Sequence, residues 1–342
     1  MSLEIRNAVI HVLDREAEEP LLNEFELDIN DDLYNFLEKH MSKCLNDDDA
    51  RKGRFKDGRN IIREVCTRMA QDNTYFLEGS KEIARQLFRA MKTNSSISST
   101  DLVICLYNQE DMDYIAVLKM DYTISFIHEI EMVEDKFKIS IKKQDISLPG
   151  VGQKIQKAAF VTGYEGVFDY DLTLVDNQIN AKNAEEPVAQ FFLQTFLDAE
   201  LIMDNKACTK LFKTESENWI REKAKEGETV VEEVRDFVNF VIRQEDQIDL
   251  NEFTERAFED KPYLREDFIS TMKDKGLMNE TFEIDKDWVE RKLAKIRLKT
   301  DSNIEITLDY EDFNDRGKFE IISNHDGTRS IIIKNIVTLQ EK

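Results

Sequence analysis

Between Asp101 and Asp176 the apolar residues of this chain occur in short runs or at every second position, which predicts β-strands rather than helices. The run "LVICLY" is continuously apolar, as expected of a strand that is buried on both faces. The segment "DYIAVLKM" follows it across the short polar link "NQEDM", which predicts a hairpin. The segments "ISFIHEIEM", "KFKISIK" and "FDYDLTLVD" continue the pattern. The region is therefore predicted to form a meandering antiparallel sheet.

The segments before this sheet region predict helices and an opening strand pair. Asp31 or Asp32 can cap a helix in which apolar residues repeat at intervals of three and four. In the segment "DDDARKGRFKDGRN" the charge changes sign within a few residues, which favours an exposed loop. We expect strands over 5–13 and 21–29, an exposed loop over 47–60, and helices over 31–45, 59–71 and 81–92.

The second half of the chain is predicted to be mainly helical. A polar segment over 176–187 ends at Pro187, which is well placed to open a helix. Thr229 and Glu232 form a capping box at the start of another helix. We expect helices over 187–201, 209–227, 230–241 and 262–276, then strands over 304–310, 317–323 and 330–337, the last two joined by the turn "NHDGTR".

These patterns predict an α+β protein with two domains. Residues 1–180 are expected to form an N-terminal α+β domain with a mainly antiparallel meandering sheet and flanking helices. Residues 181–342 are expected to form a helical C-terminal domain that ends in a small antiparallel sheet. The length of 342 residues is enough for each domain to bury a core of its own.

The charge balance argues against a strongly basic nucleic-acid binder. The chain has 47 Lys and Arg against 70 Asp and Glu, a formal net charge of −23. Proteins normally meet a polyanion with a basic face that releases counterions. However, exposed charges more than about 8 Å apart barely interact at physiological salt. The local patch therefore matters more than the sum, and an acidic body with a basic groove remains an option.

The sequence carries no strong signature of catalysis or of membrane insertion. It has no G-x-S-x-G, H-E-x-x-H, G-x-x-x-x-G-K-[ST] or G-x-G-x-x-G motif, and its beginning lacks the pattern of a signal peptide. No stretch approaches the roughly 20 apolar residues of a membrane span. The four cysteines are scattered and are predicted to be small buried hydrophobes: Cys44, Cys66, Cys105 and Cys208. We expect a cytosolic protein without catalytic residues, cofactor or metal.

One enzymatic alternative is open. Asp121, Glu134 and Lys136 follow one another around the predicted sheet, and the last two form an E-x-K pattern. An Asp, a Glu and a Lys around a sheet are the parts of a Mg²⁺-dependent nuclease, in which the metal generates the nucleophile. Acidic sequences often produce E-x-K by chance, and here it falls on a predicted hairpin turn. The chain has only four histidines, which also argues against acid–base catalysis.

Two basic clusters are the remaining candidates for a functional surface. The first basic cluster consists of Arg51, Lys52, Arg54, Lys56 and Arg59. The second basic cluster consists of Arg291, Lys292, Lys295, Arg297 and Lys299. Leu293, Ile296 and Leu298 punctuate the second cluster, which predicts an element packed on one side and charged on the other. Either cluster could be an ordinary solvated surface that pairs with nearby acids, or a face that lies along a phosphate backbone.

The order of these segments resembles the bacterial 37-kDa nucleoid-associated protein family over essentially the full chain. The resemblance rests on "IRNAVIHVLD", "DYIAVLKMDYTISFIHEIE", "LPGVGQKIQKAAFVTG", "FFLQTFLDAE", "TKLFKTESENW", "FEIDKDWVERKLAKIRLKTDSNIEI" and "GTRSIIIKNI". It is a match of overall pattern and not of a catalytic signature. It implies an association with the bacterial nucleoid and with DNA, and no established enzymatic activity.

Two hypotheses on function follow. In the first, the protein binds double-stranded DNA weakly and without sequence preference through the second basic cluster, with the first as an additional contact. In the second, it is an adaptor that DNA-processing proteins recruit to the nucleoid through its acidic surface. The sequence leaves the oligomeric state open. A homodimer is an expectation, because paired surfaces would strengthen a weak binder.

Overall fold

The structure, a computed structural model, describes residues 3–93, 97–164, 166–177, 190–226, 231–259 and 261–338. The chain forms two compact units, an N-terminal unit over Met1–Ile202 and a C-terminal unit over Met203–Lys342. The boundary expected after residue 180 lies outside the described residues. The units divide after Ile202, because the segment Phe191–Leu201 packs into the core of the N-terminal unit.

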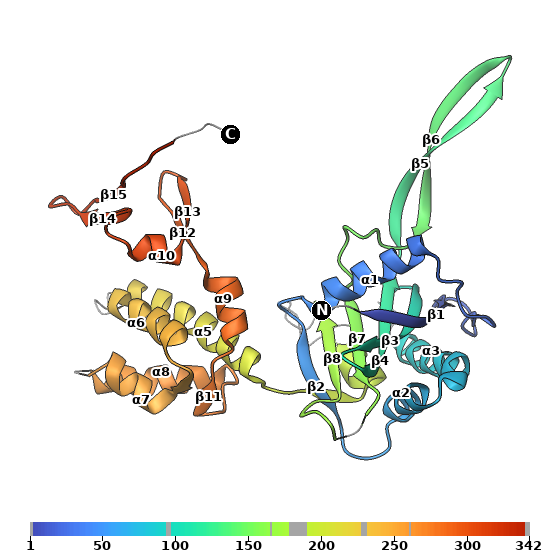
Figure 1. The fold of residues 1–342 in the computed structure, drawn as a ribbon, viewed down its shortest axis with the longest axis horizontal. Helices are drawn as coiled ribbons and strands as arrows, with labels where there is room; N and C mark the ends of the chain where they lie inside the picture. Colours follow the sequence, from blue (N-terminus) through green and yellow to red (C-terminus); the bar gives the residue numbers. More distant parts are fainter. Residues whose placement is uncertain are drawn as a thin grey trace. The chain divides into compact units, whose positions relative to one another are not determined.

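A seven-stranded antiparallel sheet organises the N-terminal unit (Figure 1). Its strand order is β1-β3-β4-β7-β8-β2-β9, and every neighbouring pair is antiparallel. This confirms the α+β fold predicted from the sequence. The strands are β1 (Glu4–Leu13), β2 (Arg51–Phe55), β3 (Thr100–Gln109), β4 (Met112–Asp121), β7 (Lys157–Thr162), β8 (Leu172–Asp176) and β9 (Ala199–Leu201).

Helices cover both faces of this sheet. α1 (Asp31–Leu45) packs on one face in a core with Val103, Cys105 and Leu118. On the other face, Ile104 and Val117 pack in a second core that includes three helical segments. These segments are α2 (Ile61–Gln71), α3 (Phe76–Lys92) and the π-helical η2 (Phe191–Phe196), and a short 3-10 turn, η1 (Asn73–Tyr75), links the first two. Because both faces are covered, "LVICLY" is buried along its length, as predicted.

One hairpin of the predicted meander does not belong to the seven-stranded sheet. β5 (Thr123–Val133) and β6 (Lys136–Ser147) pair only with each other and extend away from the rest of the N-terminal unit (Figure 1). Glu134 and Asp135 have φ angles of 48° and 58°, the left-handed conformation that a two-residue type I′ turn needs. Acids and lysines alternate with apolar residues in both strands, so neither strand can lie in a sheet that is buried on both faces.

Two expectations for the N-terminal unit were wrong. Residues 21–29 do not form a strand, and only a single bridge joins Leu21 to Val12. The segment 47–60 is not simply an exposed loop, because it contains β2, which lies between β8 and β9. In β2, Gly53 and Phe55 are buried while Arg54 is exposed. Because most residues of this segment are charged, the alternation of buried and exposed positions could not be recognised in the sequence.

The C-terminal unit has a helical core followed by small hairpins, as predicted (Figure 1). Its helices are α5 (Asn205–Lys225), α6 (Val231–Gln244), α7 (Leu250–Ala257), α8 (Pro262–Asp274), α9 (Lys286–Leu293) and α10 (Tyr310–Asn314). Its strands pair as β10 (Gln247–Asp249) with β11 (Thr281–Glu283), β12 (Lys295–Lys299) with β13 (Glu305–Asp309), and β14 (Phe319–Ser323) with β15 (Arg329–Ile333). The capping box at Thr229 and the helix start at Pro187 lie outside the described residues. The expectation of a helix as far as residue 201 was wrong, because the π-helical η2 ends at Phe196 and Ala199–Leu201 form β9, which pairs with β2.

His11 is buried in the N-terminal unit as the neutral imidazole. Its Nδ1 accepts the N–H of Asn23 at 3.1 Å, so the proton is on Nε2, which donates to Ser80 Oγ at 3.0 Å. Burial, together with the positive charges of Lys81 and Arg85, lowers the pKa of His11 from 6.5 to about 4, while the charge of Glu24 opposes this shift. A charged imidazolium is therefore disfavoured in this site.

Acidification is expected to destabilise the N-terminal unit through His11. The folded-state pKa lies below the unfolded value, so the unfolded chain binds more protons as the pH falls. The stabilisation is fully present above pH 6.5 and is lost as the pH approaches about 4. Between about pH 7 and 4.5 we expect a loss of about 2 kcal/mol. Urea unfolding of the wild type and of His11→Gln, followed by circular dichroism at both pH values, checks this.

The His11→Gln variant keeps the other acid-sensitive groups, including His40, whose pKa is also lowered by burial. Its free energy of unfolding should therefore depend less steeply on pH than that of the wild type over this window. Parallel pH dependences of the two proteins would show that His11 does not contribute.

Candidate nucleic-acid interface

The first basic cluster lies on β2 and on the segment that follows it. The side chains of this cluster are engaged within the N-terminal unit. Arg54 Nε donates to the carbonyl of Asp169 at 2.9 Å, and Lys52 Nζ lies 4.5 Å from the centre of the Tyr170 ring. The two remaining exposed cations form ion pairs: Lys56 with Asp198 at 3.1 Å and Arg59 with Glu64 at 3.4 Å. The positive potential of this cluster is therefore partly neutralised, and Arg51 is half-buried.

The second basic cluster continues from a helix into a strand. Arg291 and Lys292 belong to the last turn of α9, where positive charge is favourable beside the helix C-terminus. Lys295, Arg297 and Lys299 alternate along β12 and therefore share one face of the β12–β13 hairpin. Ile296 and Leu298 are half-buried on its other face. This agrees with the pattern of one packed and one charged side that the sequence indicates.

The neighbouring strand places acids beside this basic row. Lys295 is directly opposite Asp309, and Lys299 is opposite Glu305, with 3.2 Å between Nζ and Oε1. Arg297 faces Thr307 instead. Within the described part of the chain, neither Lys295 nor Arg297 forms an ion pair. The exposed face of this hairpin thus retains available cations, but its acids limit the local charge.

Arg243 of α6 positions this hairpin against the helical core. Its guanidinium lies 3.4 Å from the centre of the Tyr310 ring, and its Nη2 donates to the carbonyl of Leu293. The N–H of Tyr310 donates to the carbonyl of Ala294 at 2.9 Å. These contacts tie the end of α9 to the end of β13, so the cations of α9 and of β12 have a defined spatial relation. This role of Arg243 could not be predicted from the sequence pattern.

The structure separates the residues of the nuclease alternative. Asp121 ends β4 and contacts Lys119, whereas Glu134 and Lys136 lie at the far end of β5. The 11 residues of β5 span roughly 35 Å at the rise of an extended strand. Asp121 therefore cannot share a metal ion with Glu134, and this alternative is wrong. Across the described ranges, no group of three or more His, Cys, Asp or Glu side chains could hold a metal ion. The four cysteines are buried, as predicted.

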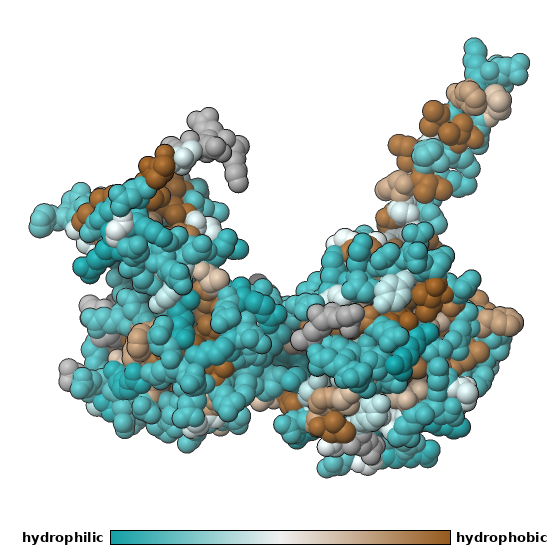
Figure 2. All heavy atoms as spheres, viewed as in Figure 1, coloured by the Kyte–Doolittle hydropathy of each residue, from teal (hydrophilic) through white to brown (hydrophobic). Residues whose placement is uncertain are grey.

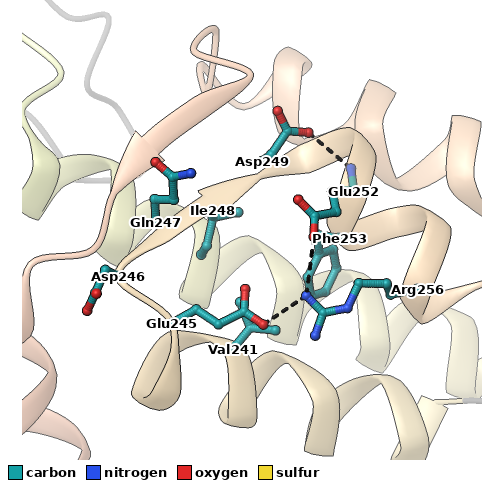
Figure 3. Close-up of a pocket in the computed structure, with 9 residues that line it drawn as sticks. All are labelled: Val241, Glu245, Asp246, Gln247, Ile248, Asp249, Glu252, Phe253 and Arg256. Atoms are coloured by element: carbon teal, nitrogen blue, oxygen red, sulfur yellow. Dashed lines mark hydrogen bonds and ion pairs between the residues drawn. The ribbon is translucent and has the colours of Figure 1, made fainter.

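A polar pocket of about 200 Å³ lies between α6, β10 and α7 (Figure 3). Its charged side chains have partners within the protein. Arg256 pairs with Glu245 at 2.8 Å and with Glu252 at 3.7 Å, and Asp249 accepts the N–H groups of Asn251 and Glu252 as the N-cap of α7. These contacts engage Arg256, Glu245 and Asp249 in holding α6, β10 and α7 together.

The comparison with known proteins points to one family. The family described as "Nucleoid-associated protein YejK" matches residues 9–340. No curated protein matches the chain. Among the described helices, none has both the length and the apolar character needed to cross a membrane.

Proposed function

The chain belongs to the nucleoid-associated protein YejK family, whose match extends over residues 9–340, and we propose that it binds duplex DNA weakly and without sequence preference. Membership supports a role at the bacterial nucleoid. The second basic cluster is the proposed contact surface, and the first basic cluster is a weaker, additional one. Double-stranded DNA is the proposed ligand, and no enzymatic step is part of the proposal.

The outward row of cations on β12 carries this proposal. Alternate residues of a strand are roughly 6.7 Å apart, so the cations of this row are close enough to meet separate phosphates of a duplex, which carries one charge per roughly 3.4 Å of axis on each strand. Lys295 and Arg297 lie on this row without an ion pair to any described residue, and the exposed Arg291 precedes the row in the last turn of α9. Such contacts bind phosphates and read no bases, so they give affinity without sequence preference.

The acids around the row explain why the binding is expected to be weak. Glu305 and Asp309 lie directly across from two of the cations, and the whole chain has a formal net charge of −23. The second basic cluster has five cations, and two of them are opposed by these acids. We therefore expect the surface to neutralise about three phosphates. Because each neutralised phosphate releases counterions, the affinity should fall steeply as salt is added.

Salt dependence is expected to reveal this contact. With about three phosphates neutralised, the affinity for a labelled DNA duplex should fall roughly 40-fold between about 50 and 200 mM salt. The variant Arg291→Gln, Lys295→Gln, Arg297→Gln should lose both the binding and its salt dependence. Fluorescence anisotropy of the duplex, titrated with the full chain, measures both quantities.

A charge-matched variant serves as the control. Arg221→Gln, Lys225→Gln, Lys275→Gln removes three exposed cations from the helical core of the same unit and should bind nearly as tightly as the wild type. Equal losses in the two variants would indicate a general charge effect rather than a contact surface. Absence of binding by the wild type at low salt would exclude direct DNA binding.

The adaptor role is the second candidate. It is favoured by the ion pairs and carbonyl contacts that engage the first basic cluster and by the large excess of acids. Here the acidic surface would dock basic faces of DNA-processing proteins. DNA retention that requires such a protein in the same reaction, and that is absent with the chain alone, would favour this role.

A further inference from the structure

A groove of about 540 Å³ lies between the β12–β13 and β14–β15 hairpins of the C-terminal unit. This volume is within the roughly 300–1,000 Å³ that is usual for ligand sites. β13 forms one wall, and the other wall comes from β14, β15 and the segment after α10. Figure 2 shows hydrophobic residues exposed on these hairpins, and Ile333 and Ile336 are 53% and 54% exposed. The apolar residues that line the groove are Ile306, Leu308, Phe319, Ile333 and Ile336.

The wall formed by β13 is an open strand edge. Among the described strands, β13 pairs only with β12. At one end of this ladder the N–H of Thr300 donates to the carbonyl of Ile304, and at the other end the N–H of Tyr310 donates to the carbonyl of Ala294. Hydrogen-bonded pairs alternate along an antiparallel ladder, so the N–H and C=O of Thr307 point away from β12. Thr307 is exposed and lines the groove, which leaves these backbone groups open to a further strand.

We propose that this groove is a docking site for another protein, which adds an extended segment of alternating basic and apolar residues to the open edge of β13. In such strand addition the main-chain hydrogen bonds give affinity, and contacts of alternate side chains give specificity. This inference goes beyond the proposed contact with DNA and does not depend on it.

The existing partner of β13 shows which residues suit a strand at its side. β12 has the sequence Lys-Ile-Arg-Leu-Lys. Its two lysines lie opposite Asp309 and Glu305, and its two apolar residues lie opposite Leu308 and Ile306. A strand on the open edge meets the same two rows of β13 side chains, because directly paired residues share a face. Its basic residues would therefore lie beside the acids, and its apolar residues would lie over the groove.

The charges along the groove also favour a basic segment. Its two lysines already pair with acids, Lys318 with Asp312 at 2.6 Å and Lys334 with Glu320. Asp315 adds a further carboxylate to the lining. An acidic segment would be repelled here, whereas lysine or arginine side chains would be attracted. The groove thus fits a partner whose docking segment carries positive charge.

Binding of a synthetic peptide to the full chain tests the proposal. The fluorescein-labelled peptide KIKVKIK is titrated with the protein at about 150 mM salt, at which exposed charges more than about 8 Å apart are screened. Its fluorescence anisotropy should rise and saturate. The peptide KKKKIVI has the same composition but cannot place charged and apolar residues on separate faces of a strand, so it should bind roughly tenfold more weakly or less.

Two pairs of variants locate the binding. Thr307→Pro removes the outward N–H and no bond to β12, so it should weaken binding about tenfold. Thr307→Val keeps this N–H and should bind as the wild type does. Ile333→Ser changes the opposite wall without altering β13 and should also weaken binding about tenfold. Its matched control is Ile332→Ser, because Ile332 pairs with Glu320 on the other face of the β14–β15 hairpin.

The proposal is overturned if KKKKIVI binds as tightly as KIKVKIK, or if Thr307→Pro and Ile333→Ser both bind like the wild type. Absence of peptide binding also overturns it. If the mass of the chain in solution then falls on substitution of Thr307→Pro, the occupant of the edge is a second copy of the chain. These titrations contain no DNA, so their outcome is independent of whether the second basic cluster binds a duplex.

Discussion

Replacement of Asp176 by Leu is expected to destabilise the N-terminal unit by about 3–5 kcal/mol, whereas Lys157→Met together with Asp176→Leu is expected to recover most of this loss. Lys157 and Asp176 are direct cross-strand partners on β7 and β8, with 2.6 Å between Nζ and Oδ1. Their side chains are only 2% and 1% exposed. Loss of one partner leaves the other charge buried, whereas an apolar pair leaves none.

The surroundings of Lys157 increase the effect of this substitution. Burial lowers the pKa of Lys157 even though the charge of Asp176 favours the protonated form. Lys119 lies directly across from Lys157 on β4 and opposes its charge, and Lys119 in turn contacts Asp121. Two buried lysines thus lie side by side, each beside an acid. Removal of one acid would leave neighbouring positive charges in a region of low dielectric constant.

Calorimetry on the full chain measures this effect, with tryptophan fluorescence as an internal reference. The chain has two tryptophans, Trp219 and Trp288, and both lie in the core of the C-terminal unit. Their transition should therefore be unchanged while the N-terminal transition shifts. Lys56→Met, which breaks an ion pair of half-exposed side chains, should cost at most about 1 kcal/mol. A double variant no more stable than Asp176→Leu alone would contradict the argument.

The pattern of apolar residues in the sequence was sufficient to predict the central strands of the sheet. "LVICLY" and "DYIAVLKM" form β3 and β4, as expected of short, β-branched apolar runs that are bounded by polar turn residues. The same period of two occurs in β5 and β6, which leave the sheet. Alternation predicts a strand with one apolar face but does not say what covers that face. The departure of this hairpin from the sheet could therefore not be predicted from the sequence.

The members of each basic cluster could be named from the sequence, but their charge environment could not. Arg54 contacts the carbonyl of Asp169, which is 115 positions away, and only the fold brings the two together. Lys299 and Glu305 are close in sequence, yet their pairing depends on the register of the β12–β13 hairpin. The number of available cations is thus a property of strand pairing, and it decides how strongly each surface can attract DNA.

Replacement of Phe268 by Ala is expected to destabilise the C-terminal unit by about 3–5 kcal/mol. Phe268 of α8 is fully buried. Its ring lies edge-on to Trp219 at 5.3 Å between centroids, and the rings of Phe253 and Phe258 lie at 5.4 and 5.7 Å. The smaller side chain would leave a cavity between three helices and remove these aromatic contacts. The surrounding rings are too large to fill the space without leaving their own contacts.

Thermal unfolding followed by tryptophan fluorescence measures this loss of stability directly, because Trp219 contacts the ring that is removed. Its midpoint should fall by roughly 10 °C or more, while the calorimetric transition of the N-terminal unit should remain in place. Phe240→Ala is the matched control, since that ring is 48% exposed and its loss should cost only about 1 kcal/mol.

The effect should reach the second basic cluster, because Trp288 and Val289 anchor α9 in the same core and α9 leads into β12. At temperatures between the midpoints of the variant and the wild type, Phe268→Ala should therefore lose any DNA binding that depends on this cluster, while Phe240→Ala retains it. If both variants bind alike at such a temperature, the contact with DNA lies outside the folded C-terminal unit.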